Sequence, residues 1–351
     1  TATSTVTITI IDDAPIVQVD ANDQNTTLIV DETDLTTNAS ADFSSSFSDS
    51  ITAGADGTAS STTTYAVSAT AGSTGLVDTA TGQAVTLSVV GGVVTGSVTI
   101  SGVETTVFTV STDNSGTVTL DQVRAIEHSN TSDHDDTNAS ITDELITLTK
   151  TVTVVDGDGD SASDSASINI GTNLNFKDDG PSITVAKTAD DADTLTVDES
   201  DLSINATANF ADNFTNTPTY GADGEGTVAS AYALTAASGS TGLVDTATGQ
   251  AVTLSVNTAG EVEGKNTDGD VVFTLSVDAS GTVTLDQDRA VVHTDSNDHD
   301  STTSLTSDLI TLTRTDTITD KDGDTSTGSD SIDLGTNLNF KDDGPSITVA
   351  K

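Results

Sequence analysis

Cysteine is absent from this 351-residue sequence, and aromatic residues make up only 3% of it. Without cysteine, neither disulfides nor thiol chemistry can operate. Small extracellular domains often depend on disulfides, so bound metal ions are the expected source of extra stability here. No apolar run approaches the length of a membrane-spanning helix and no signal peptide is visible, so we expect no direct membrane insertion. The first residue is Thr1 rather than Met, so we expect a fragment of a longer protein.

Basic residues are also scarce. Ten Lys and Arg stand against 55 Asp and Glu, which gives a formal net charge of -45. Such a chain cannot neutralise phosphates, so we expect no nucleic-acid partner and no attraction to an anionic membrane surface. Only eight of the acidic residues are Glu, and the excess of Asp favours turns and short cation-binding loops. An acidic chain with few aromatics can be disordered, but the repeated alternating segments indicate strands with one buried face.

A tandem repeat organises the chain. The segment GTNLNFKDDGPSITVAK begins at Gly171 and again at Gly335, and 335 minus 171 gives a period of 164 residues. We therefore predict four parts: the last strand of a preceding repeat at 1–12, a first β-sandwich repeat at 13–178, a second at 179–342, and the first strand of a following repeat at 343–351. Few residues separate the last strand of one repeat from the first strand of the next, and such short links predict a linear rod.

Polar and apolar residues alternate with period two in many short segments, such as the opening TVTITI. Segments of this kind, separated by turns of Gly, Asp and Asn, predict an all-β fold of tandem antiparallel β-sandwich domains. One position breaks the repeat, because Asp316 stands where the first repeat has Val152 on the predicted apolar face. That substitution predicts a strand end near an edge or a site. Apolar residues four apart predict one short helix, at Leu35, Ala39, Phe43 and Phe47.

Three carboxylates at alternate positions mark the turn near the end of each repeat, in VDGDGDS at 155–161 and in TDKDGDT at 319–325. With glycine letting the backbone curl, such carboxylates can converge on one hard cation that needs about six to eight oxygens. Paired Asp residues follow each set at the start of the next repeat, so we predict a Ca2+ site that both segments complete. The predicted ligands are Asp12, Asp13, Asp156, Asp158, Asp160, Asp178, Asp179, Asp320, Asp322, Asp324, Asp342 and Asp343.

Other interpretations of the acidic segments stay open. A solvated Asp-Gly hairpin turn explains the triads without a cation. A second candidate cation site, for which a solvated strand end is the alternative, consists of Asp31, Glu32 and Asp34 in the first repeat and of Asp198, Glu199 and Asp201 in the second. Zinc is a further possibility at the His residues, which recur 165 residues apart, but two His among Asp and Ser lack the defined set of four ligands that zinc takes. These residues, for which a structural turn is the alternative, are His128, His134, His293 and His299.

The sequence carries no recognisable catalytic apparatus. There is no Cys nucleophile, no G-x-S-x-G elbow and no H-E-x-x-H motif. Glu104, Glu127 and Glu144 have no counterparts in the second repeat, which argues against a pair of carboxylates for glycoside hydrolysis. We therefore expect a protein that is not an enzyme.

The hairpin TVTVVDGDGDSASDSASINI followed by KDDGPSITV resembles the tandem extender repeats of giant bacterial repeats-in-toxin (RTX) adhesins, which are exported by type I secretion. The resemblance covers both repeats. It implies immunoglobulin-like sandwiches, calcium at the linkers between neighbouring repeats of the same chain, and a spacer at the bacterial cell surface. Such a spacer, which we expect to be monomeric, projects a distal adhesive domain for cell adhesion or biofilm formation.

The charge of the chain agrees with calcium-dependent folding outside the cell. Repulsion among the negative charges should keep the chain expanded while calcium is scarce. Sites with dissociation constants of about 10⁻⁴ to 10⁻³ M would fill outside the cell and fold it. The alternative function is a β-sandwich binding module whose loops, such as the His-containing one, recognise a glycan or a surface. Clustered exposed aromatic residues would favour that alternative.

Overall fold

The structure is a computed structural model that describes residues 3–22, 26–137, 139–188, 193–295 and 297–345. The prediction of an all-β fold is confirmed, because the described residues form strands and five short 3-10 helical turns, with no α-helix among them. The chain divides into two compact units. The first comprises the chain to Gly180 with the turns Tyr220–Glu225 and Asp320–Asp324, and the second comprises Pro181–Thr219, Gly226–Thr319 and the residues from Thr325 onward.

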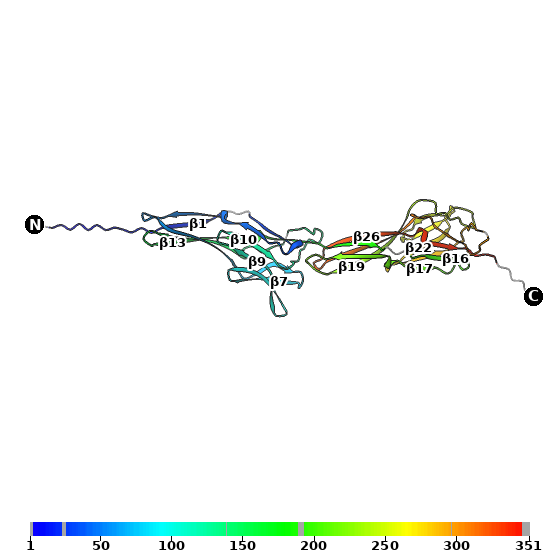
Figure 1. Ribbon diagram of the computed structural model, residues 1–351, viewed down its shortest axis with the longest axis horizontal. Helices are drawn as coiled ribbons and strands as arrows, with labels where there is room; N and C mark the ends of the chain where they lie inside the picture. The colour runs from blue at the N-terminus through cyan, green and yellow to red at the C-terminus, as the bar shows by residue number, and fades with distance from the viewer. Residues whose placement is uncertain (1–2, 23–25, 138, 189–192, 296, 346–351) are drawn as a thin grey trace, which may run out of the picture. The chain divides into compact units, whose positions relative to one another are not determined.

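The described residues of the first unit form four sheets, and many of their strands alternate more and less buried residues. Figure 1 shows the strands of this unit as blue to green arrows. Their strand orders are β3-β10-β9-β8-β7-β6, β13-β12-β5, β11-β14-β2 and β1-β4. The strands are β1 (Ile16–Ala21), β2 (Leu28–Asp31), β3 (Ala39–Asp42), β4 (Phe47–Thr52), β5 (Thr58–Ala69), β6 (Ser73–Asp78), β7 (Gln83–Val90), β8 (Val93–Ile100), β9 (Val103–Thr112), β10 (Thr117–Gln122), β11 (Ala139–Ser140), β12 (Ile146–Asp156), β13 (Ser161–Asn169) and β14 (Leu174–Lys177), with 3-10 turns at Glu32–Asp34, Ser44–Ser46 and Gly171–Asn173.

The second unit repeats this plan with fewer strands in its largest sheet. Its strand orders are β17-β23-β22-β21-β20, β19-β25-β26, β16-β27-β24 and β15-β18. The strands are β15 (Ser182–Lys187), β16 (Leu195–Asp198), β17 (Ala206–Asn209), β18 (Phe214–Thr219), β19 (Thr227–Ala236), β20 (Thr253–Val256), β21 (Val262–Lys265), β22 (Val271–Val277), β23 (Thr282–Gln287), β24 (Thr302–Ser304), β25 (Ile310–Thr319), β26 (Thr325–Asp333) and β27 (Leu338–Lys341), with 3-10 turns at Ala211–Asn213 and Gly335–Asn337.

Most strand pairs are antiparallel, as the sequence predicted, but in the described residues one pair in each unit is parallel. β14 pairs with β2, and the register ends with Lys177 opposite Asp31. β27 pairs with β16 in the same way, and Lys341 lies opposite Asp198. In a parallel pair, the residues that follow both strands leave the sheet at the same end. The next residues, Glu32 and Asp178 in the first unit, therefore emerge side by side.

Each unit has its own apolar core. In the first unit the rings of Phe108 and Phe176 pack with their centroids 5.3 Å apart. Gly96 lies against the Phe108 ring, and a Cβ atom there would stand 2.2 Å from it. Gly264 and Phe273 repeat the contact in the second unit. Glycine is required at these two strand positions because the ring occupies the space of any side chain.

The predicted short helix is wrong. Ala39 lies in β3, which pairs with β10, and Phe47 begins β4. Ser, Thr and Asn have low helix propensity, and the Asp42 carboxylate accepts the Ser44 N–H at 2.8 Å, which favours a turn. Phe43 and Phe47 are nevertheless buried, so the four-residue spacing marked core positions in an irregular segment.

The prediction that Asp316 lies near an edge or a site is also wrong. β25 lies between β19 and β26, and Asp316 is fully buried within it. Arg314 Nε donates to the Asp316 carboxylate at 2.8 Å, so the acidic residue belongs to an internal ion pair.

Strands were predicted at both ends of the chain. Residues 5–10, predicted as a strand of a preceding repeat, form no strand here, and Val6, Ile8 and Ile10 are exposed. Of the strand predicted at 343–351, residues 346–351 lie outside the described residues.

Candidate metal centre

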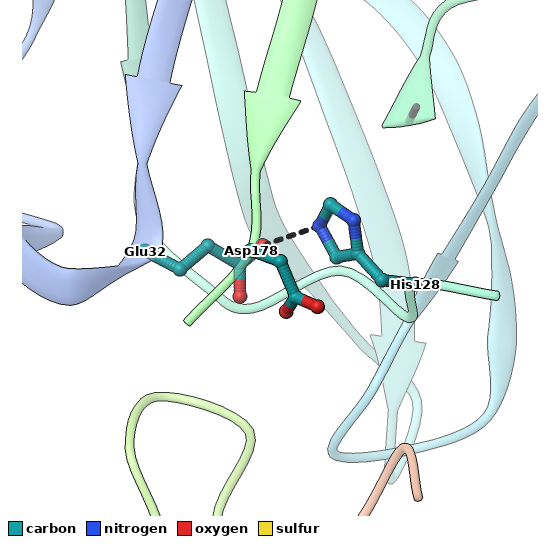
Figure 2. A group of neighbouring side chains, drawn as sticks. All are labelled: Glu32, His128 and Asp178. Atoms are coloured by element: carbon teal, nitrogen blue, oxygen red, sulfur yellow. Dashed lines mark ion pairs between the residues drawn. The ribbon is translucent and has the colours of Figure 1, made fainter. Parts of the chain in front are cut away.

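The parallel pair of β2 and β14 builds the centre of the candidate site. Glu32 follows β2, Asp178 follows β14, and His128 comes from the loop after β10. Figure 2 shows Glu32 and His128 facing each other, with the Asp178 carboxylate beside them. One donor atom from each lies within 4.8 Å of the other two, and all three residues are at most 3% exposed. A parallel pair and one loop thus gather two carboxylates and an imidazole in the protein interior.

Glu32 is held in place through one of its two oxygens. Its Oε1 accepts hydrogen bonds from Gln122 Nε2 at 2.6 Å and from the Ile126 N–H at 2.9 Å. The other oxygen, Oε2, is buried and has no hydrogen-bond partner. Burial raises the pKa of the Glu32 carboxyl above its ordinary value, although these hydrogen bonds and His128 oppose the shift.

His128 is oriented by a second acidic residue. Its Nδ1 lies 3.1 Å from Asp136 Oδ1, which is hydrogen-bond distance. Its Nε2 lies 3.6 Å from Glu32 Oε1 and has no hydrogen-bond partner. Burial alone would lower the pKa of His128, but the carboxylates of Glu32, Asp178 and Asp136 outweigh it and raise the pKa to about 9.

Asp178 has the least satisfied carboxylate of the three. The residue is fully buried, and neither of its carboxylate oxygens has a hydrogen-bond partner. Burial, reinforced by Asp324 and Asp322, raises its pKa to about 8, even though His128 favours the ionised form. An orphaned buried carboxylate is costly, and a bound cation would remove that cost.

Two turns from later in the chain belong to the first unit and add carboxylates, Tyr220–Glu225 and Asp320–Asp324. Asp223 is 2% exposed, and both its oxygens lack hydrogen-bond partners. It forms an oxygen-only group with Glu32 and Asp179, whose donor atoms lie within 4.8 Å of one another. Burial, and then the Glu32 charge, raise the pKa of Asp223 to about 8.

The structure brings the predicted triad of the first repeat together, with Asp12 from the start of the same unit as its neighbour, whereas Asp178 and Asp179 of the pair predicted to complete it group with Glu32. One oxygen from each of Asp156, Asp158 and Asp160 lies within 4.8 Å of the others, and Asp158 also groups with Asp12 and Asp56. Asp156 Oδ1 accepts two backbone N–H groups of its own turn, at 3.1 and 2.8 Å. Its Oδ2 is buried and has no partner. The turn thus fixes one oxygen and leaves the other to face the neighbouring carboxylates.

The second triad has the same local geometry. Asp320 Oδ1 accepts two backbone N–H groups of its turn at 3.2 and 2.7 Å, and Asp320 Oδ2 has no partner. Asp322 Oδ1 and both oxygens of Asp324 are buried without hydrogen-bond partners. Burial raises the pKa of Asp320 to about 7. His134 Nε2 lies 3.9 Å from Asp324 Oδ2.

The second member of each Asp pair holds the Gly-Ala-Asp-Gly turn. Asp13 accepts the Ala55 N–H at 3.2 Å, and Asp179 accepts the Ala222 N–H at 3.1 Å. A Cβ at Gly54 would stand 2.5 Å from the Asp13 carboxylate, so this close approach requires glycine. These turns present Asp56 and Asp223 to the groups described above, a role that the sequence did not predict.

The second repeat contains a matching centre. Glu199, His293 and Asp342 place their donor atoms within 4.8 Å of one another, and these half-buried residues line a cavity of about 360 Å³ that Asp343 also borders. Glu199 Oε1 accepts the Val291 N–H at 2.8 Å, as Glu32 does from Ile126.

The second candidate cation site of the sequence is only partly brought together. Glu32 joins the centre, but Asp31 pairs with Lys177 at 2.9 Å and Asp34 accepts the Thr36 N–H at 3.0 Å. The His residues, for which a structural turn was the alternative, differ in burial, because His128 is buried in the centre whereas His299 is exposed. The sequence could have pointed to this centre, because Glu32 and His128 each recur once per repeat.

The side chains fit divalent cations. Carboxylate oxygens are the ligands that Ca2+ prefers, and several of them are buried without hydrogen-bond partners. Hydrogen bonds from the backbone hold the opposite oxygen of Asp156 and of Asp320, so the turns are ordered before any ion is considered.

Among the described residues, no helix has the length and apolar character needed to cross a membrane.

The sequence matches no curated protein and aligns with solved structures at low identity. Among solved structures, the protocadherin GammaB4 extracellular domain aligns with 94% of this chain and 34% of its own at 11% identity and a TM-score of 0.18. PcdhgB3 EC1-4 aligns with 94% of this chain and 76% of its own at 12% identity and a TM-score of 0.17. The chain thus spans about a third of the first of these proteins, and neither TM-score supports a conclusion about fold.

A family model gives a direct assignment. The family described as "Domain of unknown function (DUF5801)" matches residues 27–171 and again residues 194–335. Together the two matches cover well over half of the chain, with one match in each repeat. The chain is therefore a tandem pair of DUF5801 domains and belongs to that family.

Proposed function

We propose that the chain is a structural extender of an RTX-type adhesin, and that calcium ions rigidify its tandem repeats. The protein would be secreted, reside at the bacterial cell surface as a monomer without enzymatic activity, and hold a distal adhesive domain away from the cell. The observation that carries the proposal is the set of buried carboxylate oxygens without hydrogen-bond partners at Asp156, Asp223, Asp320, Asp322 and Asp324.

These oxygens couple folding to cation binding. Several buried negative charges in one place repel one another, and each costs several kcal/mol unless it is paired. A divalent cation that binds only the folded chain stabilises it by RT ln(1 + [L]/Kd), which is about 2.7 kcal/mol at a hundred times Kd. Folding and calcium binding should therefore occur together.

The expected calcium affinity determines where the chain would fold. Extracellular calcium modules have dissociation constants of about 10⁻⁴ to 10⁻³ M, so such sites stay empty in a cytosol and fill outside. The formal charge of -45 opposes compaction until cations bind. Two copies of one domain family in tandem also agree with a repetitive spacer.

The binding-module alternative receives less support. Carbohydrate recognition through loops would use exposed aromatic side chains. Tyr65 instead packs against Phe47, and Tyr232 packs against Phe214, with ring centroids 6.0 and 6.4 Å apart. These rings serve the cores of their units, which favours the extender.

Small-angle X-ray scattering tests the proposal. We expect the two-repeat chain to be stiffer in calcium than in chelator, and we expect the double variant Asp322→Asn with Asp324→Asn to scatter like the chelated protein. The matched control replaces the exposed Asp20 and Asp212 with Asn, which removes the same charge away from the site. Scattering that is identical in calcium and in chelator would refute the proposal.

A further inference from the structure

We propose that Glu32, His128 and Asp178 form a site for a first-row transition-metal ion, represented by Zn2+, that shares Glu32 with one oxygen-only group but differs from these groups in its nitrogen donor. The proposal goes beyond the extender function, because the site would bind its ion whether or not calcium stiffens the chain. All three donor atoms lie within 4.8 Å of one another in the interior of the first unit.

The imidazole of His128 is oriented with one nitrogen free to bind an ion. Nδ1 of His128 lies 3.1 Å from Asp136 Oδ1, which fixes the ring orientation and favours the tautomer with the proton on Nδ1. In the neutral ring that a metal ion would bind, Nε2 carries the lone pair, in a buried position where it has no hydrogen-bond partner, 3.6 Å from Glu32 Oε1. A carboxylate that holds the far nitrogen of a histidine is the usual outer arrangement around protein metal ions.

Two carboxylates beside His128 supply further ligands. Glu32 Oε2 and both oxygens of Asp178 are also buried without hydrogen-bond partners. Hydrogen bonds from Gln122 and from the Ile126 N–H hold the other oxygen of Glu32, so its free oxygen has a fixed position. Three protein ligands are thus available around one point, which is the number that an open zinc site uses.

The nitrogen donor decides the class of ion. Calcium and magnesium take oxygen ligands almost exclusively. Imidazole nitrogen favours zinc, copper, iron and nickel, and carboxylates bind several of these as well. In an all-oxygen calcium site, the unpartnered nitrogen of a buried imidazole would not bind the ion.

The second repeat supplies an internal comparison. Glu199, His293 and Asp342 keep the three ligands, but Ser301 stands where the first repeat has Asp136. Nδ1 of His293 is accordingly buried without a partner. Loss of an outer hydrogen bond to a ligating histidine weakens metal binding by about 10- to 100-fold. The first site should therefore bind Zn2+ more tightly than the second.

The test is a Zn2+ titration of the metal-stripped two-repeat chain, by calorimetry and by competition with a chelating indicator, in buffer that contains saturating calcium. We expect His128→Gln to abolish the tighter class of binding and Asp136→Ser to weaken it by about 10- to 100-fold. Ser301→Asp should strengthen the second class, a gain that misfolding cannot produce. The matched control is His299→Gln, which changes an exposed histidine in the corresponding loop of the second repeat.

The outcomes separate this proposal from the extender function. Absence of tight Zn2+ binding, or binding that is equal in the wild type, His128→Gln and His299→Gln variants, would overturn the zinc site and indicate an internal ion pair or adventitious surface binding. Calcium titration and scattering of the same variants report on the extender independently. A Nε2 resonance of His128 that shifts on Zn2+ addition in the ¹⁵N-histidine spectrum would support the proposal.

Discussion

The buried ion pair of the second unit gives a quantitative prediction about stability. Arg314 donates from Nε and Nη2 to Asp316 at 2.8 Å, and Asn216 Nδ2 donates to the same carboxylate at 2.5 Å. In the first unit, Lys150 stands in the place of Arg314 and pairs instead with Asp49 at 2.6 Å, at the position that corresponds to Asn216. The acidic partner therefore occupies a different strand in each repeat.

Replacing Asp316 with Val, the residue at this position in the first repeat, removes the negative partner and leaves a buried cation. Removing one member of a buried pair costs about 3–5 kcal/mol. The Arg314 side chain keeps 12% exposure and lies 6.0 Å from the Tyr232 ring, so we expect a loss of about 3 kcal/mol. Each kcal/mol lowers Tm by about 2–4 °C for a repeat of this length, which gives a decrease of roughly 6–12 °C.

The double variant Asp316→Val with Asn216→Asp should recover most of this loss, because it rebuilds the arrangement of the first repeat. Asn216→Asp alone should also destabilise the protein, because it places a second carboxylate beside Asp316. Scanning calorimetry of the two-repeat chain at fixed calcium measures all three variants. An unchanged melting temperature for Asp316→Val, or a double variant no more stable than the single one, would refute the reasoning.

Two further predictions concern pH and packing. In chelator, Tm should fall as pH rises from about 5 to 8. The pKa values of Asp178 and Asp223 are each raised to about 8, so the folded chain holds more protons than the unfolded chain in this range. Saturating calcium should flatten the dependence of Tm on pH, and a Tm that does not change with pH in chelator would contradict this prediction. Gly96→Ala should cost about 1–3 kcal/mol, because the new Cβ would stand 2.2 Å from the Phe108 ring, and urea unfolding that matches the wild type would show that the ring can move aside.

The repeat and its alternation were sufficient to predict the class of fold. Period-two patterns identify strands and their buried faces, but they do not say which strands pair or in which direction. The parallel pair of β2 and β14 joins segments that are more than 140 residues apart, and nothing local in either segment marks the direction of pairing. The five-residue turn at Asp320–Asp324 was predictable because its carboxylate spacing is local.

The centre of the candidate site depends on the part of the fold that the sequence did not reveal. Glu32 and Asp178 meet only because β2 and β14 are parallel, and His128 reaches them from a third segment. The acidic triads were predicted, since their geometry is set within one turn. Asp316 was misinterpreted for a related reason. Its partner Arg314 lies only two residues away, but Asp316 is buried because β25 lies between two other strands, and the sequence did not reveal that arrangement.

Calcium binding at equilibrium is the measurement that tests the account most directly. The two-repeat chain, stripped of metal and held at pH 7.5 and physiological salt, would be titrated with Ca2+ by calorimetry while circular dichroism follows its folding. The account predicts saturable binding with dissociation constants of about 10⁻⁴ to 10⁻³ M, accompanied by a gain in strand structure or in Tm. Absence of saturable binding, with a fold that is equally stable in chelator, would contradict it.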